Sequence, residues 1–326
     1  MSEFPAVKLH VVSGKGGTGK TTVAAALALS LAAGGRQVLL TEVEGRQGIA
    51  QLFDTPPLPY EERKVAVARG GGEVYALAID PEQALLEYLE QFYNLRRAGS
   101  MLKKLGAIDF ATTIAPGMRD VLLTGKVMEA TTRERRGGGR LYDAVVLDAP
   151  PTGRIARFLN VNTEVAALAR MGPVRNQADS VMRLLQSSKT AVHLVTVLEE
   201  MPVQETIDGI AELTATDLPV GAVFVNMVRE PLLPEDALEA AAQGKVDKPA
   251  LRRGLKAAGL DADAPLVTAL AGEATDHAGR VLLERRERAL LDDLHRPTYE
   301  LPLIDDAADL SGLYELAGRL HDTGMV

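Results

Sequence analysis

The chain has 326 residues, is 46% hydrophobic and 25% charged, and carries a net charge of −8. Proteins that coat DNA or bind anionic membranes need an excess of Lys and Arg, so we expect neither kind of partner. The absence of cysteine excludes thiolate zinc sites, iron–sulfur clusters and arsenite capture by thiols. The five histidines show no ligand spacing, and we expect them on the surface or in strands rather than at a metal: His10, His193, His277, His295 and His321.

The N-terminus gives no sign of export. Met1–Pro5 lacks a basic segment followed by an apolar run, so we expect no signal peptide and a cytoplasmic protein. The longest apolar stretch, Val23 to Ala33, is too short to span a bilayer, and we expect no direct membrane insertion. The length fits one large domain over residues 1–326 with an inserted lobe.

A glycine-rich loop follows the first predicted strand. Val7–Val12 is a short β-branched run, and residues 23–33 predict a helix rich in alanine and leucine. The loop between them has the G-x-x-x-x-G-K-[ST] spacing of a phosphate-binding P-loop. Its glycines let backbone N–H groups turn toward phosphate oxygens, Lys20 meets the β/γ charge, and Thr21 offers a hydroxyl to Mg²⁺. The predicted nucleotide-binding residues are Gly14, Lys15, Gly16, Gly17, Thr18, Gly19, Lys20, Thr21 and Thr22.

Lys15 is an additional lysine directly after the first glycine of this loop. One interpretation is a solvated loop charge. The other is that Lys15 cannot easily curl back onto the phosphates of its own loop, so it reaches the nucleotide of a facing subunit. Cations supplied in this way raise phosphoryl-transfer rates by about 10³–10⁵-fold. On the second interpretation, fast hydrolysis requires a dimer.

Two carboxylates follow the second apolar run, Val38–Leu40. Glu44 is our candidate for orienting the attacking water and for the Mg²⁺ site, and Glu42 is its competitor. Either residue could instead be an exposed loop charge.

Apolar runs alternate with helical patterns along much of the chain. This alternation predicts an α/β fold with a mostly parallel sheet covered by helices on both faces. Residues 81–136 break the alternation and predict an inserted helical lobe, and residues 232–295 predict a charged helical segment. The predicted strands are residues 38–40, 74–79, 144–147, 192–197 and 220–225.

Apolar residues of the predicted lobe recur at helical spacing. The simpler interpretation is that they pack against each other as the core of the lobe. The alternative is an ATP-gated groove that binds an apolar client helix of a membrane protein. The residues concerned are Leu85, Leu89, Phe92, Met101, Met118, Leu122 and Met128.

Asp148 follows the apolar strand Val145–Leu147 and precedes a Pro-Pro-Thr-Gly turn. A P-loop enzyme needs a carboxylate at a strand end to organise Mg²⁺, and the stiff turn gives Asp148 a loop that can sense the γ-phosphate. The alternative is a strand-end aspartate in an ordinary turn.

Together these segments resemble the ArsA family of deviant-Walker P-loop ATPases, which contains arsenite-pump ATPases and ATPases that target tail-anchored membrane proteins. The resemblance covers nearly the whole chain and rests on residues 14–22, on Asp148–Leu159 and on Pro116-Gly117. It is to a cysteine-free bacterial member with a single domain. It implies a SIMIBI-type P-loop NTPase fold and hydrolysis of ATP with Mg²⁺ held by Thr21, Glu44 and Asp148. It also implies that Asn226 contacts adenine and that Pro302 and Leu303 pass beside the base.

The chain departs from the family pattern at three positions. Glu44 replaces the aspartate that orients water, Gly45 replaces the proline after it, and Arg154 replaces a histidine. An added methylene moves the carboxylate by more than an ångström, and a misplacement of about 1 Å can cost roughly 10²-fold in rate. Because each site is shared between two subunits, we expect a homodimer, or a heterodimer in which a paralogous ATPase supplies better catalytic residues; the unusual Glu44 motivates the second hypothesis. A subunit that energises an anion transporter is a further alternative, whereas arsenite transport is not implied.

Overall fold

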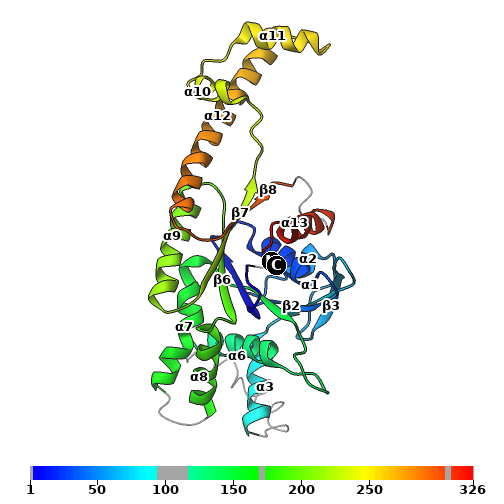
Figure 1. Cartoon of the computed structure of the whole chain (residues 1–326), viewed down its shortest axis with the longest axis vertical. Coiled ribbons are helices and arrows are strands. Elements are labelled where there is room, and N and C mark those ends of the chain that lie inside the picture. The colour runs from blue at the N-terminus through cyan, green and yellow to red at the C-terminus, as the bar shows by residue number, and fades with distance from the viewer. Residues whose placement is uncertain (1–2, 94–116, 169–172, 305–309, 326) are drawn as a thin grey trace.

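The computed structural model describes residues 3–93, 117–168, 173–304 and 310–325. Within these residues eight strands form one sheet in the order β3-β4-β2-β5-β1-β6-β7-β8 (Figure 1). Neighbouring strands are parallel except for β3 and β4, which confirms the predicted α/β class. The strands are β1 Leu9–Gly14, β2 Gln37–Glu42, β3 Arg63–Val67, β4 Glu73–Ala78, β5 Ala144–Asp148, β6 Thr190–Thr196, β7 Val220–Val228 and β8 Thr298–Pro302.

The strand register brings the carboxyl ends of the central strands together. Val12 of β1 and Glu42 of β2 both pair with Asp148, the last residue of β5. These strands are continuous apolar runs because helices cover both of their faces. Open parallel sheets bind ligands outside the carboxyl ends of their strands, so this edge is where a site is expected.

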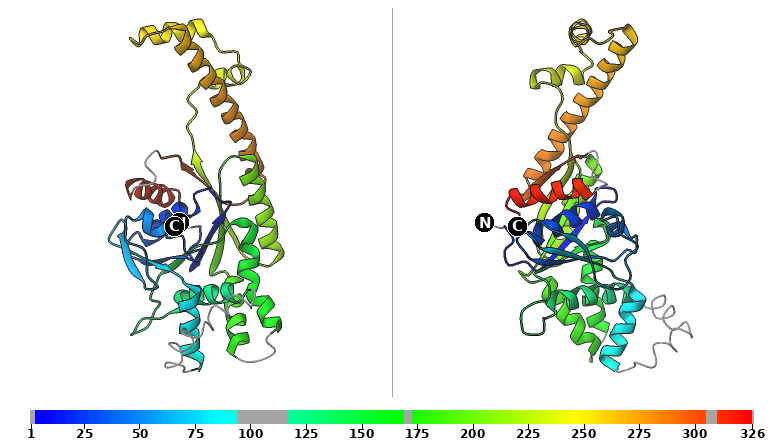
Figure 2. Two further views of the ribbon diagram at one scale, coloured as in Figure 1. Left: turned by 180° about the vertical axis from the view of Figure 1, so that it is seen from behind. Right: turned by 90° about the vertical axis from the view of Figure 1, so that its right-hand side faces the viewer.

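Helices cover both faces of the sheet (Figure 2). One face carries α1 Lys20–Ala32, α2 Gly48–Leu52 and α13 Leu310–Asp322. The other carries α6 Met118–Thr132, α7 Thr152–Leu168, α8 Pro173–Leu185 and α9 Glu200–Ala215, with α3 Pro81–Tyr93 against α6. Residues 23–28 of α1 are 0% exposed. Their small alanines let α1 lie close to the sheet and to α13, which fixes the loop that precedes α1.

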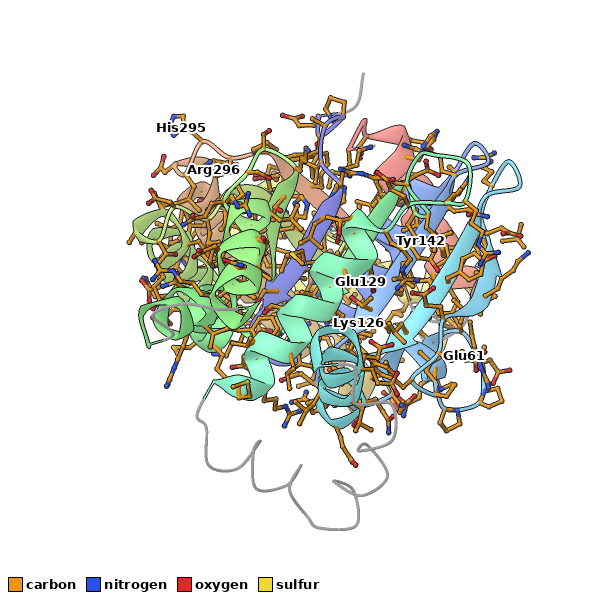
Figure 3. The ribbon with its side chains drawn as sticks, turned by 90° about the horizontal axis from the view of Figure 1, so that it is seen from below. Glu61, Lys126, Glu129, Tyr142, His295 and Arg296 are labelled. Atoms are coloured by element: carbon orange, nitrogen blue, oxygen red, sulfur yellow. The ribbon has the colours of Figure 1, made fainter. Side chains whose placement is uncertain are left out.

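The segment predicted as an inserted lobe contains α3 and α6. Seen from below, α6 runs along the underside of the sheet with Lys126 and Glu129 on it (Figure 3). Lys126 joins the two helices, because its Nζ lies 2.8 Å from the Glu87 carboxylate of α3. Leu122 is buried and Met128 packs against the sheet core, which supports packing within the protein over a client groove.

The other apolar residues of that segment give less evidence on whether it packs within the protein or forms a client groove. Leu85 and Met118 are partly exposed. Met101 and Pro116 lie outside the described residues, as do the side chains of Leu89 and Phe92.

Residues 232–295 contain three helices that form an arm: α10 Glu235–Ala242, α11 Lys248–Ala257 and α12 Ala264–Asp292. The arm projects from the sheet beside β7 (Figure 1). At 1.5 Å per residue, the 29 residues of α12 span about 43 Å. Of the helices in the described part of the chain, none is long and apolar enough to cross a membrane.

Two histidines meet inside the core, where β1 lies beside β6. His10 and His193 are both 0% exposed. The Ala222 N–H donates to His193 Nδ1 over 3.0 Å, so the His193 proton sits on Nε2, which lies 3.1 Å from His10 Nδ1. His10 therefore carries its own proton on Nε2, which is buried with no hydrogen-bond partner among the described residues. Burial lowers the pKa of His10 to about 3 and that of His193 well below its usual value, so both rings are neutral.

Candidate active site

The glycine-rich loop connects β1 to α1, as predicted, and two of its glycines are required by geometry. Gly19 has φ 82°, and a Cβ there would lie 2.3 Å from the Asn226 side-chain nitrogen. A Cβ on Gly14 would lie 2.2 Å from the Val195 carbonyl oxygen. The loop therefore sits directly against β6 and the end of β7. No side chain with a Cβ fits at either position without moving these neighbours.

The loop opens onto the first turn of α1, which begins at Lys20. No side chain caps this helix and its first turn holds no acidic residue, so its free N–H groups remain for an anion. Thr18 closes the loop internally, because its hydroxyl donates to the Lys15 carbonyl over 2.9 Å. The loop and helix end thus form a cradle suited to phosphate oxygens.

Thr21 and Asp148 meet at the edge of this cradle. The Thr21 hydroxyl donates to the Asp148 carboxylate over 2.7 Å, although the two residues are 127 positions apart. The Ser13 hydroxyl donates to the Pro150 carbonyl over 2.6 Å and ties the loop after Asp148 to β1. Burial raises the pKa of Asp148 to about 6, with Glu42 and Glu44 adding repulsion. Burial also lowers the pKa of Lys20.

This pair fits a magnesium ion. A hydroxyl and a carboxylate are ligands that Mg²⁺ accepts, and it usually keeps waters and substrate phosphates as its remaining ligands. Because burial raises the pKa of Asp148, a cation beside this carboxylate would stabilise its charged form. In the described part of the chain, no group of three or more His, Cys, Asp or Glu residues could hold a metal ion alone.

The two candidate water-orienting residues lie in different surroundings. Glu42 is buried, and its carboxylate accepts N–H groups of Gln47 at 2.8 Å and of Ile49 at 3.3 Å. It therefore fixes the start of α2. The Glu44 side chain is 23% exposed and lies 3.6 Å from Arg46. It lines a polar pocket of about 190 Å³ together with residues of α6 and α7, among them Arg119, Asp120 and Arg154.

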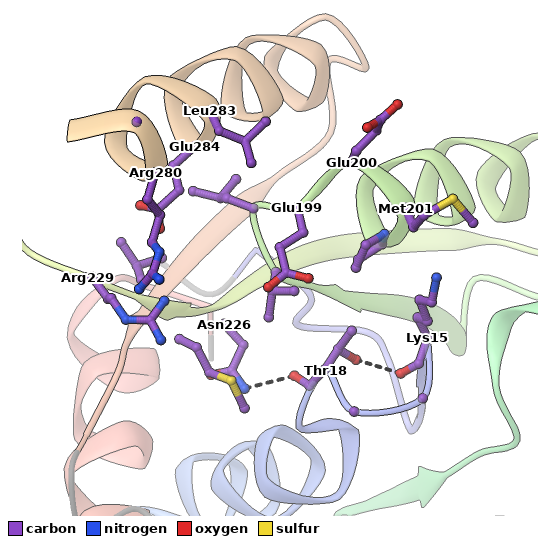
Figure 4. A pocket seen from close by; sticks show the side chains of 18 residues that line it. Lys15, Thr18, Glu199, Glu200, Met201, Asn226, Arg229, Arg280, Leu283 and Glu284 are labelled. Atoms are coloured by element: carbon purple, nitrogen blue, oxygen red, sulfur yellow. Dashed lines mark hydrogen bonds between the residues drawn. The ribbon is translucent and has the colours of Figure 1, made fainter. Parts of the chain in front are cut away.

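Asn226, at the end of β7, braces the loop and also lines a larger pocket. Its side-chain N–H donates to the Thr18 carbonyl over 2.9 Å. The pocket, of about 760 Å³, has a volume typical of small-molecule sites. Because we propose below that it takes part of the nucleotide, we call it the nucleotide pocket. Its walls are residues 15–18 of the loop, residues 197–202 before and in α9, residues 226–229 of β7 and its end, and four residues of α12: Gly279, Arg280, Leu283 and Glu284 (Figure 4).

The wall from α12 was not predicted from the sequence. Glu284 is 9% exposed, and burial raises its pKa although Arg229, Arg288 and Arg280 lie near it. The charged, helical character of residues 232–295 gave no sign that one turn of this segment returns to the site.

Pro302 and Leu303 lie beside the nucleotide pocket, at the end of β8. The Leu303 N–H donates to the Val228 carbonyl over 2.8 Å. Pro302 lines a separate pocket of about 320 Å³ that shares Val228, Arg229 and Glu284 with the nucleotide pocket. Neither residue lines the nucleotide pocket itself in this structure.

Lys15 lies on the opposite wall of the nucleotide pocket from α12 (Figure 4). Its Nζ is 3.0 Å from a carboxylate oxygen of Glu205 on α9. The Lys20 Nζ, in contrast, donates back to the Lys15 carbonyl over 3.4 Å. The two lysines of the loop therefore point in different directions.

Comparison of the sequence with known proteins identifies ATPases as its relatives. The family model described as anion-transporting ATPase (ArsA) matches residues 7–187, which include the loop, Glu44 and Asp148. The putative ATPase Mb3704 of Mycobacterium bovis and ATPase BagA of Mycobacterium tuberculosis are each 54% identical over 325 residues, covering 99% of this chain and 95% of each relative.

A more distant relative shares part of the chain. ATPase GET3 of Kluyveromyces lactis is 28% identical over 251 residues, covering 67% of this chain and 71% of that protein. The family model matches more than half of the chain, and the phosphate cradle with its Thr21–Asp148 pair lies inside the match. The chain therefore belongs to the ArsA family of anion-transporting ATPases, and its reaction is the hydrolysis of ATP.

Proposed function

We propose that this protein is a cytoplasmic ATPase that binds the phosphates of Mg·ATP in the cradle of the loop and α1, with the base toward the nucleotide pocket, and hydrolyses ATP between two facing subunits. The observation that carries the proposal is the 2.7 Å hydrogen bond between Thr21 and Asp148, beside the uncapped start of α1. This arrangement offers backbone N–H groups, a lysine, a hydroxyl and a carboxylate around one point, which are the groups that phosphoryl transfer needs.

Each residue has a separate role in this proposal. Lys20 and the loop N–H groups bind the β- and γ-phosphates, while Thr21 and Asp148 hold the magnesium site. A bound Mg²⁺ ion neutralises negative charge that develops on the phosphate oxygens. Asn226 and the turn of α12 around Arg280 flank the base and ribose.

Glu44 is the better candidate to orient the attacking water. Both carboxylate oxygens of Glu42 are engaged by backbone N–H groups, whereas Glu44 is partly exposed on the loop that follows β2. A residue that orients water must keep a carboxylate oxygen available.

Lys15 is proposed to act on the nucleotide of the facing subunit. Its side chain leaves the loop toward α9 and is 29% exposed, whereas Lys20 turns back into the loop. The partner is a second copy of this chain or a paralogous ATPase.

A mixing experiment tests this role. Lys15→Ala and Lys20→Ala are each expected to abolish fast single-turnover hydrolysis. If Lys15 acts in trans, an equal mixture of the two variants regains about one quarter of wild-type activity, because half of the dimers then hold one complete site. A mixture that stays inactive contradicts the trans role. So does a Lys15→Ala protein that is as fast as wild type.

A further inference from the structure

One carboxylate connects the phosphate-binding loop to the segment that follows Asp148. Glu205, on the second turn of α9, lies 3.0 Å from Lys15 Nζ through its Oε1. Its Oε2 accepts the Thr152 hydroxyl over 3.1 Å. Thr152 is the first residue of α7 and comes four residues after Asp148. Glu205 thus contacts both the loop that carries Lys15 and the start of α7, which follows Asp148.

The surrounding packing holds Thr152 against α9. Thr152 is 3% exposed, and its methyl group lies near Gly209, one turn further along α9. A Cβ on Gly209 would lie only 3.5 Å from that methyl group, so the start of α7 packs closely against α9 where α9 has no side chain. Since the Thr152 hydroxyl is fixed by this packing, it orients the Glu205 carboxylate with its other oxygen toward Lys15.

Lys15 cannot serve Glu205 and a facing nucleotide at once. The Lys15 ammonium lies 3.0 Å from the Glu205 carboxylate of the same subunit, so the Lys15 side chain lies along the surface of its own subunit rather than toward a facing one. The Lys15 side chain is 29% exposed and that of Glu205 34%, so the ion pair is partly solvated and weak enough to exchange. A triphosphate of higher charge competes for the same ammonium group.

We propose that Glu205 is a positioning residue for Lys15. In a subunit without a facing nucleotide it holds Lys15 against α9, and nucleotide-dependent pairing of subunits transfers Lys15 from Glu205 to the phosphates across the interface. The transfer leaves Glu205 bonded to Thr152 alone, so engagement of Lys15 is sensed at the start of α7. This inference rests on the trans role of Lys15 proposed above.

The test replaces Glu205 and follows dimer formation. With a non-hydrolysable ATP analogue and sedimentation velocity, Glu205→Gln is expected to lower the half-saturating analogue concentration by about fivefold, the factor that corresponds to a partly exposed ion pair of about 1 kcal/mol. Glu205→Asp, which keeps the charge, is expected to shift it less. Glu212→Gln removes the same charge from an exposed position of α9 and serves as the matched control, expected to behave as wild type.

A purely structural role for Glu205 predicts a different pattern. If the role is purely structural, Glu205→Gln lowers the melting temperature and also weakens dimer formation. If Glu205 holds Lys15, the same variant releases Lys15 and strengthens dimer formation at an unchanged melting temperature. In a Lys15→Ala background the effect of Glu205→Gln must vanish, because the ion pair is already absent. Unchanged or weaker dimer formation by Glu205→Gln, or an effect that survives in the Lys15→Ala background, overturns the inference.

The outcomes also separate the inference from the proposed function. If Lys15→Ala hydrolyses ATP as fast as wild type, the trans role of Lys15 fails. If Lys15→Ala is slow and Glu205→Gln matches wild type in dimer formation, the trans role stands and only the assignment of Glu205 fails.

Discussion

The buried histidine pair makes the fold sensitive to acid well above the pH at which carboxylates protonate. His10 and His193 are neutral in the folded protein, and among the residues that the structure describes no carboxylate stabilises a charge on either ring. In the unfolded chain both rings regain a pKa near 6.5. Because the folded pKa values are lowered, the stability from this pair is present above pH 6.5 and is lost as the pH falls below it.

The size of the effect follows from this difference. Between pH 7 and pH 5 each histidine of the unfolded chain goes from about one-quarter to nearly fully protonated, while both histidines of the folded chain stay neutral. One pKa unit corresponds to about 1.4 kcal/mol, so each histidine lowers the free energy of unfolding by about 2 kcal/mol and the pair by about 4 kcal/mol. Asp148 acts in the opposite direction, because its raised pKa of about 6 makes the folded state take up a proton first.

A difference measurement isolates the pair from Asp148 and the other carboxylates. Urea unfolding followed by circular dichroism at pH 7 and pH 5 is compared between wild type and a His10→Gln, His193→Gln double variant, which cannot titrate at these positions. The wild type is expected to lose about 4 kcal/mol more than the variant over this interval. A difference below about 1 kcal/mol would show that the pair takes up protons in the folded state, and the reasoning from burial would be wrong.

Three further predictions concern the site. Thr21→Val removes the hydroxyl that faces Asp148, so it is expected to raise the Mg²⁺ concentration for half-maximal hydrolysis by about tenfold or more. Thr21→Ser keeps a hydroxyl and is expected to stay near the wild-type value. Equal values for the two variants would contradict the assignment of Thr21 to the Mg²⁺ site. Gly19→Ala places a methyl group against Asn226 at a backbone φ of 82° that alanine rarely adopts. Calorimetry is expected to show ATP binding weakened by at least about tenfold. Gly16→Ala is the control and is expected to lose less affinity, because a Cβ there meets no other atom within 4 Å. Asn226→Ala removes the side chain that we propose lies beside the base, and it is expected to weaken ATP binding more than GTP binding. Equal losses would show that Asn226 only braces the loop through the Thr18 carbonyl.

Local sequence was sufficient for the parts of the site that lie next to each other in the chain. The spacing of glycine, lysine and threonine from Gly14 to Thr22 is typical of a phosphate-binding loop, and the apolar strand that ends at Asp148 places a carboxylate at a strand end. The long apolar strands were predicted because parallel strands buried on both faces are continuous hydrophobic runs. The predicted helix after the loop began at Val23, three residues late, because Lys20–Thr22 is too polar to show helical periodicity.

The elements and contacts that the sequence did not predict have two physical causes. The edge strands β3 and β8 are short and partly exposed, with polar residues in β3 and a proline at the end of β8, so neither has the pattern of a buried strand. The contacts of Glu205 with Lys15, of His10 with His193 and of α12 with the nucleotide pocket join residues far apart in the chain. Such contacts depend on strand order and helix placement, which hydrophobic periodicity does not specify.

The continuity of α12 gives the arm the properties of a lever. The turn of this helix around Leu283 forms a wall of the nucleotide pocket, and the helix begins at Ala264, about 28 Å away at the rise of an α-helix. A tilt of about 10° at the pocket would displace the start of α12 by about 5 Å. One continuous helix thus links the wall of the nucleotide pocket to the part of the arm against which the exposed helix α11 packs.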